Sequence, residues 1–164
     1  MPLVPPPPVV DAALALRRVL LRLADSLLPP WAAVWDRTMG VARTEIIGVL
    51  ASLGVADELA GGPLTAEELA SRLAVDPDAL HRVMRVAAAD GLFKLDRRGR
   101  FKLTRFGKTL RSDSPATLRP WARYMALDST RRAWADVGES VRTGRSASER
   151  VNGTSAWGWF ATHP

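Results

Sequence analysis

The sequence predicts a mainly α-helical protein whose centre is a winged helix-turn-helix, in which two short helices precede a small β-hairpin wing. Three observations within residues 54–112 predict it. Two helix starts carry N-cap residues, a glycine ends the second helix, and two apolar-polar-apolar triplets flank a polar turn. We divide the chain into a proline-rich leader, a helical dimerisation arm, the winged helix and C-terminal helices, at residues 1–10, 11–53, 54–112 and 113–164.

The segment before the winged helix predicts a helical arm. The leader, MPLVPPPPVV, is typical of polyproline-like structure and lacks the basic start and long apolar core of a signal peptide. One helix is expected over 11–28 and a second over 31–53, because the consecutive prolines between them end a helix. Their apolar surface is too wide for one neighbour. We therefore expect the arm to dimerise through Leu16, Leu20, Leu23, Leu27, Trp31 and Trp35.

The first helix of the winged helix is predicted to begin at Thr65. The Thr65 hydroxyl can accept a hydrogen bond from a backbone N–H of the first turn, and Glu68 can reach back to complete a capping box. Leu64 and Leu69 occupy the two positions of a hydrophobic staple. The next helix is predicted to begin at Asp76-Pro77 and to end at Gly91, because glycine adopts the left-handed conformation at little cost.

The wing is predicted from two FKL triplets, at 93–95 and 101–103, joined by a turn at 96–99, after which Thr104 can cap one more helix. Its basic side chains form a patch that would attract phosphate. This patch makes a DNA-binding regulator the alternative function. Nucleic acid is nevertheless the less favoured partner, because the helix that would enter the major groove begins Asp76-Pro77-Asp78. The basic wing comprises Lys94, Arg97, Arg98, Arg100 and Lys102.

The C-terminal region shows three more helical patterns, over 115–127, 128–142 and 154–161, with a loop expected over 143–153. All six tryptophans of the chain lie outside residues 36–120. Large apolar surfaces are rarely left in water, and closed two-fold dimers are the commonest assembly. A homodimer is therefore the expected partner arrangement.

Composition excludes several classes of function. The chain of 164 residues has 47% hydrophobic content, enough for one domain with an added arm, and a net charge of +6. Because the chain has no cysteine and only two histidines, we expect no disulfide, no metal site and no thiol nucleophile. No apolar run reaches the roughly 20 residues of a membrane span, so we expect no membrane partner and a cytoplasmic location.

Several motifs together resemble the N-terminal region of the S-adenosylmethionine (SAM)-dependent small-molecule O-methyltransferases. They are LGVADELAGGPLTAEELASRL, DPDALHRVMRVAAADGLF, GRFKLTRFGKTL, ESVRTGR and GTSAWGWFATHP, and the resemblance covers about residues 31–164. It implies a winged-helix dimerisation domain that intertwines two subunits and forms a lid on the substrate. It also implies that a following Rossmann-like domain binds SAM and transfers the methyl group.

The resemblance implies only modest roles for residues of this chain. Met125 and Asp128 fall where relatives place substrate-contacting side chains, and Trp157 falls where an aromatic residue closes over the site. Ser148 and Asn152 depart from the residues usual there. The implied methyl acceptor is a small aromatic or polyketide-like hydroxyl.

We expect no catalytic residue and no bound cofactor in this chain alone, since no glycine-rich SAM-binding run occurs in it. It is predicted to be inactive by itself, as a truncated O-methyltransferase-like protein. Whether the truncation is natural stays open. A third hypothesis is that the chain is a natural short relative that pairs with, or competes against, a full-length methyltransferase.

Overall fold

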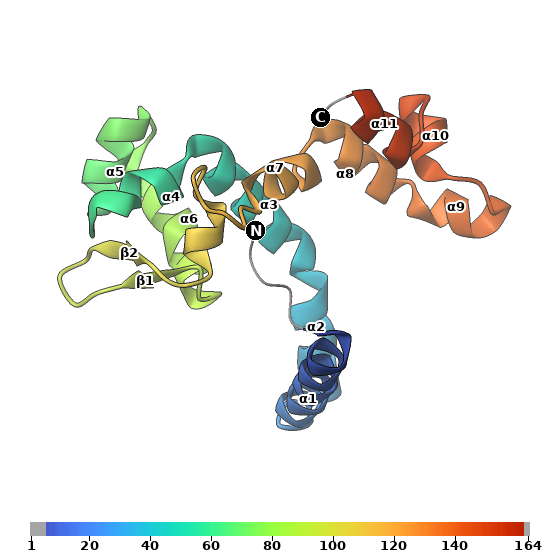
Figure 1. Ribbon diagram of the computed structural model, residues 1–164, viewed down its shortest axis with the longest axis horizontal. Coiled ribbons are helices and arrows are strands. Elements are labelled where there is room, and N and C mark those ends of the chain that lie inside the picture. The colour runs from blue at the N-terminus through green and yellow to red at the C-terminus, as the bar shows by residue number, and fades with distance from the viewer. Residues whose placement is uncertain (1–5, 163–164) are drawn as a thin grey trace. The chain divides into compact units, whose positions relative to one another are not determined.

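The computed structural model describes residues 6–162 and is mainly helical with one two-stranded antiparallel sheet, as predicted (Figure 1). It divides into two compact units, residues 1–43 and 44–164, which are described separately. Within the described residues no single helix is long and apolar enough to cross a membrane. One bent helix pair, Pro30–Leu53 with Val55–Gly61, reaches that length and composition, but it supplies Leu50, Val55 and Leu59 to the protein core.

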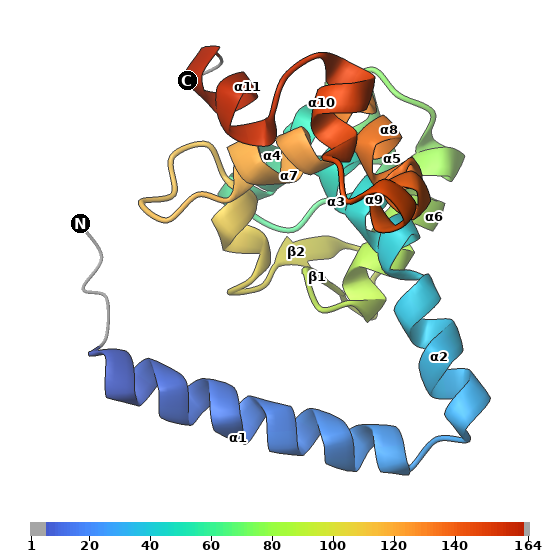
Figure 2. The same cartoon turned by 90° about the vertical axis from the view of Figure 1, so that its right-hand side faces the viewer.

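The first unit contains α1 (Pro7–Ser26), α2 (Pro30–Thr38) and the start of α3 (Gly40–Leu53). Helix α1, the long blue helix of Figure 2, begins inside the expected leader, because proline fits the first helical turn, where its missing N–H is not needed. Residues 1–5 of that leader lie outside the described residues. The helix ends at Ser26, two residues earlier than expected.

The single helix expected over 31–53 is wrong, because the chain breaks at Met39. The ψ angle of Met39 is −3°, and the Trp35 carbonyl accepts both from the Met39 N–H at 3.2 Å and from the Thr38 hydroxyl at 2.7 Å. Gly40 follows, and glycine is a poor helix former that favours a break here.

The second unit contains the main core. After α3 come α4 (Val55–Glu58), a 3₁₀ turn η1 (Leu59–Gly61), α5 (Ala66–Leu73), α6 (Pro77–Ala89), β1 (Phe93–Leu95) and β2 (Phe101–Leu103). Phe93 and Phe101, one from each strand, are 1% and 0% exposed. They pack with Leu50, Leu69 and Met84, so the hairpin is anchored by its aromatic side chains.

The predicted helix boundaries at the centre of this unit are confirmed. The Glu68 N–H donates to Thr65 Oγ1 at 3.2 Å, and the Thr65 N–H donates to Glu68 Oε2 at 2.7 Å. The Ala79 N–H donates to Asp76 Oδ1 at 2.7 Å. Gly91 has φ +79° and follows the last residues of α6 in a Schellman motif, with the Leu92 N–H donating to the Ala87 carbonyl at 3.0 Å.

The predicted hairpin is also confirmed, with Lys94 paired to Lys102 at its centre. Leu64 forms an additional antiparallel bridge to Phe101, which ties the start of α5 to the sheet. The helix expected after Thr104 is a short 3₁₀ turn, η2 (Gly107–Leu110), whose N-cap residue is Phe106. Thr104 Oγ1 nevertheless accepts from the Gly107 N–H at 3.2 Å. The winged-helix description of these elements stays a prediction.

The C-terminal region is more finely divided than expected. It contains α7 (Arg119–Met125), α8 (Asp128–Ala135), α9 (Val137–Thr143), α10 (Ala147–Asn152) and α11 (Ala156–Thr162). The single helix expected over 128–142 is wrong, because Asp136, with ψ 8°, separates α8 from α9. The loop expected over 143–153 contains α10, whose first turn is capped by Ser146.

Helix α7 is joined to the core by a close approach and a polar clasp. A Cβ atom added at Gly48 would lie 2.2 Å from Ala126 Cβ, so α3 and the end of α7 meet where only glycine fits. Arg119 donates to Asp57 Oδ2 at 2.5 Å and to the Ala51 carbonyl at 3.0 Å. Asp57 Oδ1 also accepts from the Ser112 N–H at 2.8 Å. These contacts position the aromatic residues of α7.

Candidate functional site

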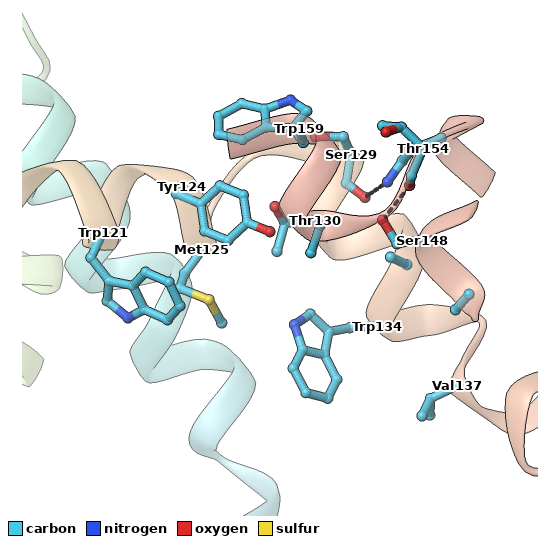
Figure 3. A pocket seen from close by; sticks show the side chains of 14 residues that line it. Trp121, Tyr124, Met125, Ser129, Thr130, Trp134, Val137, Ser148, Thr154 and Trp159 are labelled. Carbon is cyan, nitrogen blue, oxygen red and sulfur yellow. Dashed lines mark hydrogen bonds between the residues drawn. The ribbon is translucent and has the colours of Figure 1, made fainter. Parts of the chain in front are cut away.

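A half-open cavity of about 340 Å³ lies among α7, α8, the start of α9, α10 and α11 (Figure 3). Its volume is at the lower end of the range for small-molecule sites, roughly 300–1,000 Å³. Its walls are mainly apolar and aromatic, with hydroxyl and amide groups from Ser129, Thr130, Ser148, Asn152 and Thr154. No side chain along the lining carries a formal charge. The aromatic and sulfur-containing part of the lining is Trp121, Tyr124, Met125, Trp134 and Trp159.

An aromatic cluster supports one wall of the cavity. The Tyr124 ring centroid lies 5.0 Å from that of Trp159, 4.6 Å from that of Phe160 and 5.5 Å from that of Trp121. These tilted contacts fall within the 4.5–7 Å range of favourable aromatic pairs. Residues from α7 and α11 therefore hold one another in place.

Polar contacts attach α10 to the opposite wall. Arg150 at the end of α10 forms an ion pair with Asp136 and donates through Nε to Asp136 Oδ2 at 2.9 Å. The Asn152 amide donates to the Ser129 carbonyl at 3.0 Å. Ser148 Oγ donates to the Thr154 carbonyl at 2.8 Å, which closes the turn into α11. The break at Asp136 thus has a role, because it places this carboxylate beside Arg150.

The arrangement is suited to binding and lacks the parts of an acid–base site. Uncharged aromatic walls can stack against a planar ring, and the hydroxyl and amide groups can bind substituents at its edge. Among residues 6–162, no group of three or more histidine, cysteine or acidic side chains could hold a metal ion.

The structure brings one of the three predicted substrate-proximal residues to the cavity. Met125 lines it, between Trp121 and Trp134 in Figure 3. Asp128 is not in the lining and forms ion pairs with Arg131 and Arg132. Trp157 is 83% exposed and is also outside the lining.

Sequence reasoning missed Trp121 and Trp159 as lining residues, although the grouping of tryptophans after residue 120 was the available signal. Ser148 and Asn152 also line the cavity.

The predicted dimer arm leaves its apolar side chains in water. None of the residues of α1 is buried. Leu20 is 56% exposed, Leu23 59%, and Leu27 85%. Leu16, Trp31 and Trp35 are between 61% and 73% exposed. Exposed apolar surface of this kind marks an interaction site.

The basic wing is a solvated hairpin with an acidic centre. Asp96 Oδ1 accepts from the Arg98 N–H at 2.8 Å and the Arg100 N–H at 3.0 Å. The Arg100 backbone N–H is the main reason that the pKa of Asp96 lies below its usual value. Asp96 also forms an ion pair with the Arg100 side chain. On α6, the helix that would enter a DNA groove, the acidic Asp78 is exposed in the first turn.

Known proteins were compared with the chain, and the family model described as the O-methyltransferase dimerisation domain matches residues 35–113. Residues 35–113 are an O-methyltransferase dimerisation domain. Phenazine O-methyltransferase PhzM of Lysobacter antibioticus is 40% identical over 121 residues, which cover 74% of this chain and 35% of that protein. A naphthoate 7-O-methyltransferase of Streptomyces carzinostaticus is 37% identical over 76% of this chain and 38% of that protein. The chain thus spans about a third of the length of the curated relatives it matches.

Solved O-methyltransferase structures share this fold. The crystal structure of LaPhzM superposes with a TM-score of 0.75 at 36% identity, over 84% of this chain and 41% of that one. The structure of NcsB1 in complex with SAM and 2-hydroxy-5-methyl naphthoic acid has a TM-score of 0.59 at 35% identity, over 74% of this chain and 38% of that one. Neither the matched family nor these relatives support the alternative of a DNA-binding regulator.

Proposed function

We propose that this O-methyltransferase dimerisation domain joins two copies of the chain through the arm and supplies an aromatic wall of a site for a planar acceptor. The exposed leucines of α1 are the observation that carries the proposal. A 20-residue helix with no buried residue gains little from its own unit. A second copy would remove its apolar surface from water.

The cavity fits the methyl acceptor and does not fit the cofactor. SAM carries a sulfonium, an ammonium and a carboxylate, and burying such charges without partners is costly. The uncharged lining offers them no ion pair. A planar ring with uncharged hydroxyl substituents matches these walls better. We therefore assign binding of the methyl acceptor to this chain, and we assign it no chemical step.

Sedimentation equilibrium on the purified chain tests the dimer. Burying a leucine side chain fully is worth about 1.5–3 kcal/mol, and Leu20 and Leu23 still expose 56% and 59% of their area. Burial of the remainder is therefore worth about 1 kcal/mol each, or about 4 kcal/mol over two copies. The double variant Leu20→Ser with Leu23→Ser should weaken the dimer about a thousandfold.

The matched control is Arg18→Ser with Arg22→Ser, which alters the same helix at its exposed polar positions. This control should stay dimeric. A wild-type chain that sediments as a monomer at high micromolar concentration would refute the dimer. So would a leucine variant that dimerises as tightly as the arginine control.

A further inference from the structure

The Tyr124 hydroxyl is held rigidly in the cavity without a partner of its own. Three aromatic neighbours, Trp121, Trp159 and Phe160, surround its ring. Within residues 6–162 the hydroxyl makes no hydrogen bond to a side chain or backbone group. Figure 3 shows it directed away from Trp121 and among the other lining side chains.

Two other polar groups of the lining already have partners within the protein. Ser148 Oγ donates to the Thr154 carbonyl, and the Asn152 amide donates to the Ser129 carbonyl. These hydrogen bonds shape the wall and use the Ser148 hydroxyl hydrogen and one of the two amide N–H groups of Asn152. A phenol, in contrast, can both donate and accept, and the fixed ring of Tyr124 loses little freedom when it binds.

The surroundings of Tyr124 indicate the shape of the ligand. Trp121 and Trp134 lie on either side of Met125 in Figure 3, and all three line the cavity. Aromatic faces and a polarizable sulfur suit a flat ring system. A volume of about 340 Å³ accommodates a bicyclic or tricyclic ring better than a long flexible chain.

We infer that Tyr124 is a specificity determinant, which hydrogen-bonds a hydroxyl or carbonyl at the edge of a planar, fused-ring aromatic ligand seated in this cavity. The inference rests on the acceptor-wall part of the proposed function and is independent of the dimer. The inference also sets the orientation of the ligand. Its polar edge faces Tyr124 on α7, and its opposite edge remains open to the rest of the site.

Isothermal titration calorimetry with two probes of nearly equal shape tests it. The full 164-residue chain and its Tyr124→Phe variant are titrated with 2-naphthol and 2-methylnaphthalene, which differ by a hydroxyl in place of a methyl group. Phenylalanine keeps the ring contacts and removes only the oxygen. The ratio of the two dissociation constants should shift against 2-naphthol by about three- to tenfold in the variant, the effect of one neutral hydrogen bond. Binding of 2-methylnaphthalene should be unchanged.

Thr143→Ala is the control, since it removes a hydroxyl that lies outside the cavity lining and donates to the Glu139 carbonyl. Its ratio should equal that of the wild type. An unchanged ratio in Tyr124→Phe, or an equal shift in Thr143→Ala, would overturn the role of Tyr124 while the cavity still binds rings. If neither probe binds the wild type, the inference and the acceptor wall both fail, and the sedimentation experiment still decides the dimer separately.

Discussion

Gly48→Ala should weaken the attachment of α7 to the core, because the two helices meet at this glycine. The new Cβ would lie 2.2 Å from Ala126 Cβ and 3.1 Å from the Ala122 carbonyl oxygen. Ordinary van der Waals contact begins at 3.4 Å, so the helices must separate by about 1.2 Å, the difference between those two distances. Since α7 carries Tyr124, the cavity wall would move as well.

Two opposing effects set the size of the change. Overpacking of a buried contact costs about 1–3 kcal/mol. Replacing a helical glycine by alanine returns about 0.5–1 kcal/mol of backbone entropy. Because a 2.2 Å contact is severe, we expect a net loss of about 1–2 kcal/mol in the free energy of unfolding, which corresponds to a shift of about 0.5–1 M in the urea midpoint.

Urea unfolding followed by circular dichroism, at one protein concentration throughout, measures this change. Gly138→Ala is the matched control, because Gly138 is also helical but has no atom within 4 Å of the added Cβ. It should be neutral or about 0.5 kcal/mol more stable. Adding Ala126→Gly to Gly48→Ala should restore most of the loss. The packing argument is refuted if Gly48→Ala is as stable as Gly138→Ala, or if the second substitution restores nothing.

Three further predictions concern local structure. Ala74 closes α5 in the left-handed region with φ +54°, so Ala74→Gly should raise the free energy of unfolding by about 0.5–1 kcal/mol, and an unchanged or lower urea midpoint would contradict this. Thr65→Ala removes the capping box and should lower the free energy of unfolding by about 1 kcal/mol. Thr65→Ser keeps a hydroxyl at the cap and should retain most of that stability. Folding lowers the pKa of Asp96 below the usual carboxyl value of 3.8. The ionised Asp96 side chain therefore stabilises the fold above pH 3.8, and this contribution is lost as the pH falls through the lower pKa of the folded state. Urea midpoints of wild type and Asp96→Asn should therefore converge below pH 3.8, and a gap that widens on acidification would show that the sign is wrong.

Local signals were sufficient for the central elements of the fold. A cap is a contact between residues three positions apart, so the contacts of Thr65 and Asp76 could be read directly from the sequence. The same holds for Gly91, whose left-handed conformation follows from local sterics. The helix breaks were missed because Met39 and Asp136 are not helix breakers by type. The break at Asp136 accompanies its ion pair with Arg150, 14 residues away.

By itself, the sequence determined the helical class, the two capped helices with their hairpin and, through its motifs, the O-methyltransferase family. These features depend on hydrophobic periodicity and on contacts between residues a few positions apart, which can be recognised in the sequence. Only the tertiary structure decided that Tyr124 and Trp159 share one cavity and that Asp128 and Trp157 lie outside it. The lining side chains belong to five helices and the turn before α11, and the direction of each side chain is set by packing such as the close approach of Gly48 to Ala126. Which side chains share the cavity depends on contacts between residues far apart in the sequence, and spacing along the chain does not predict such contacts.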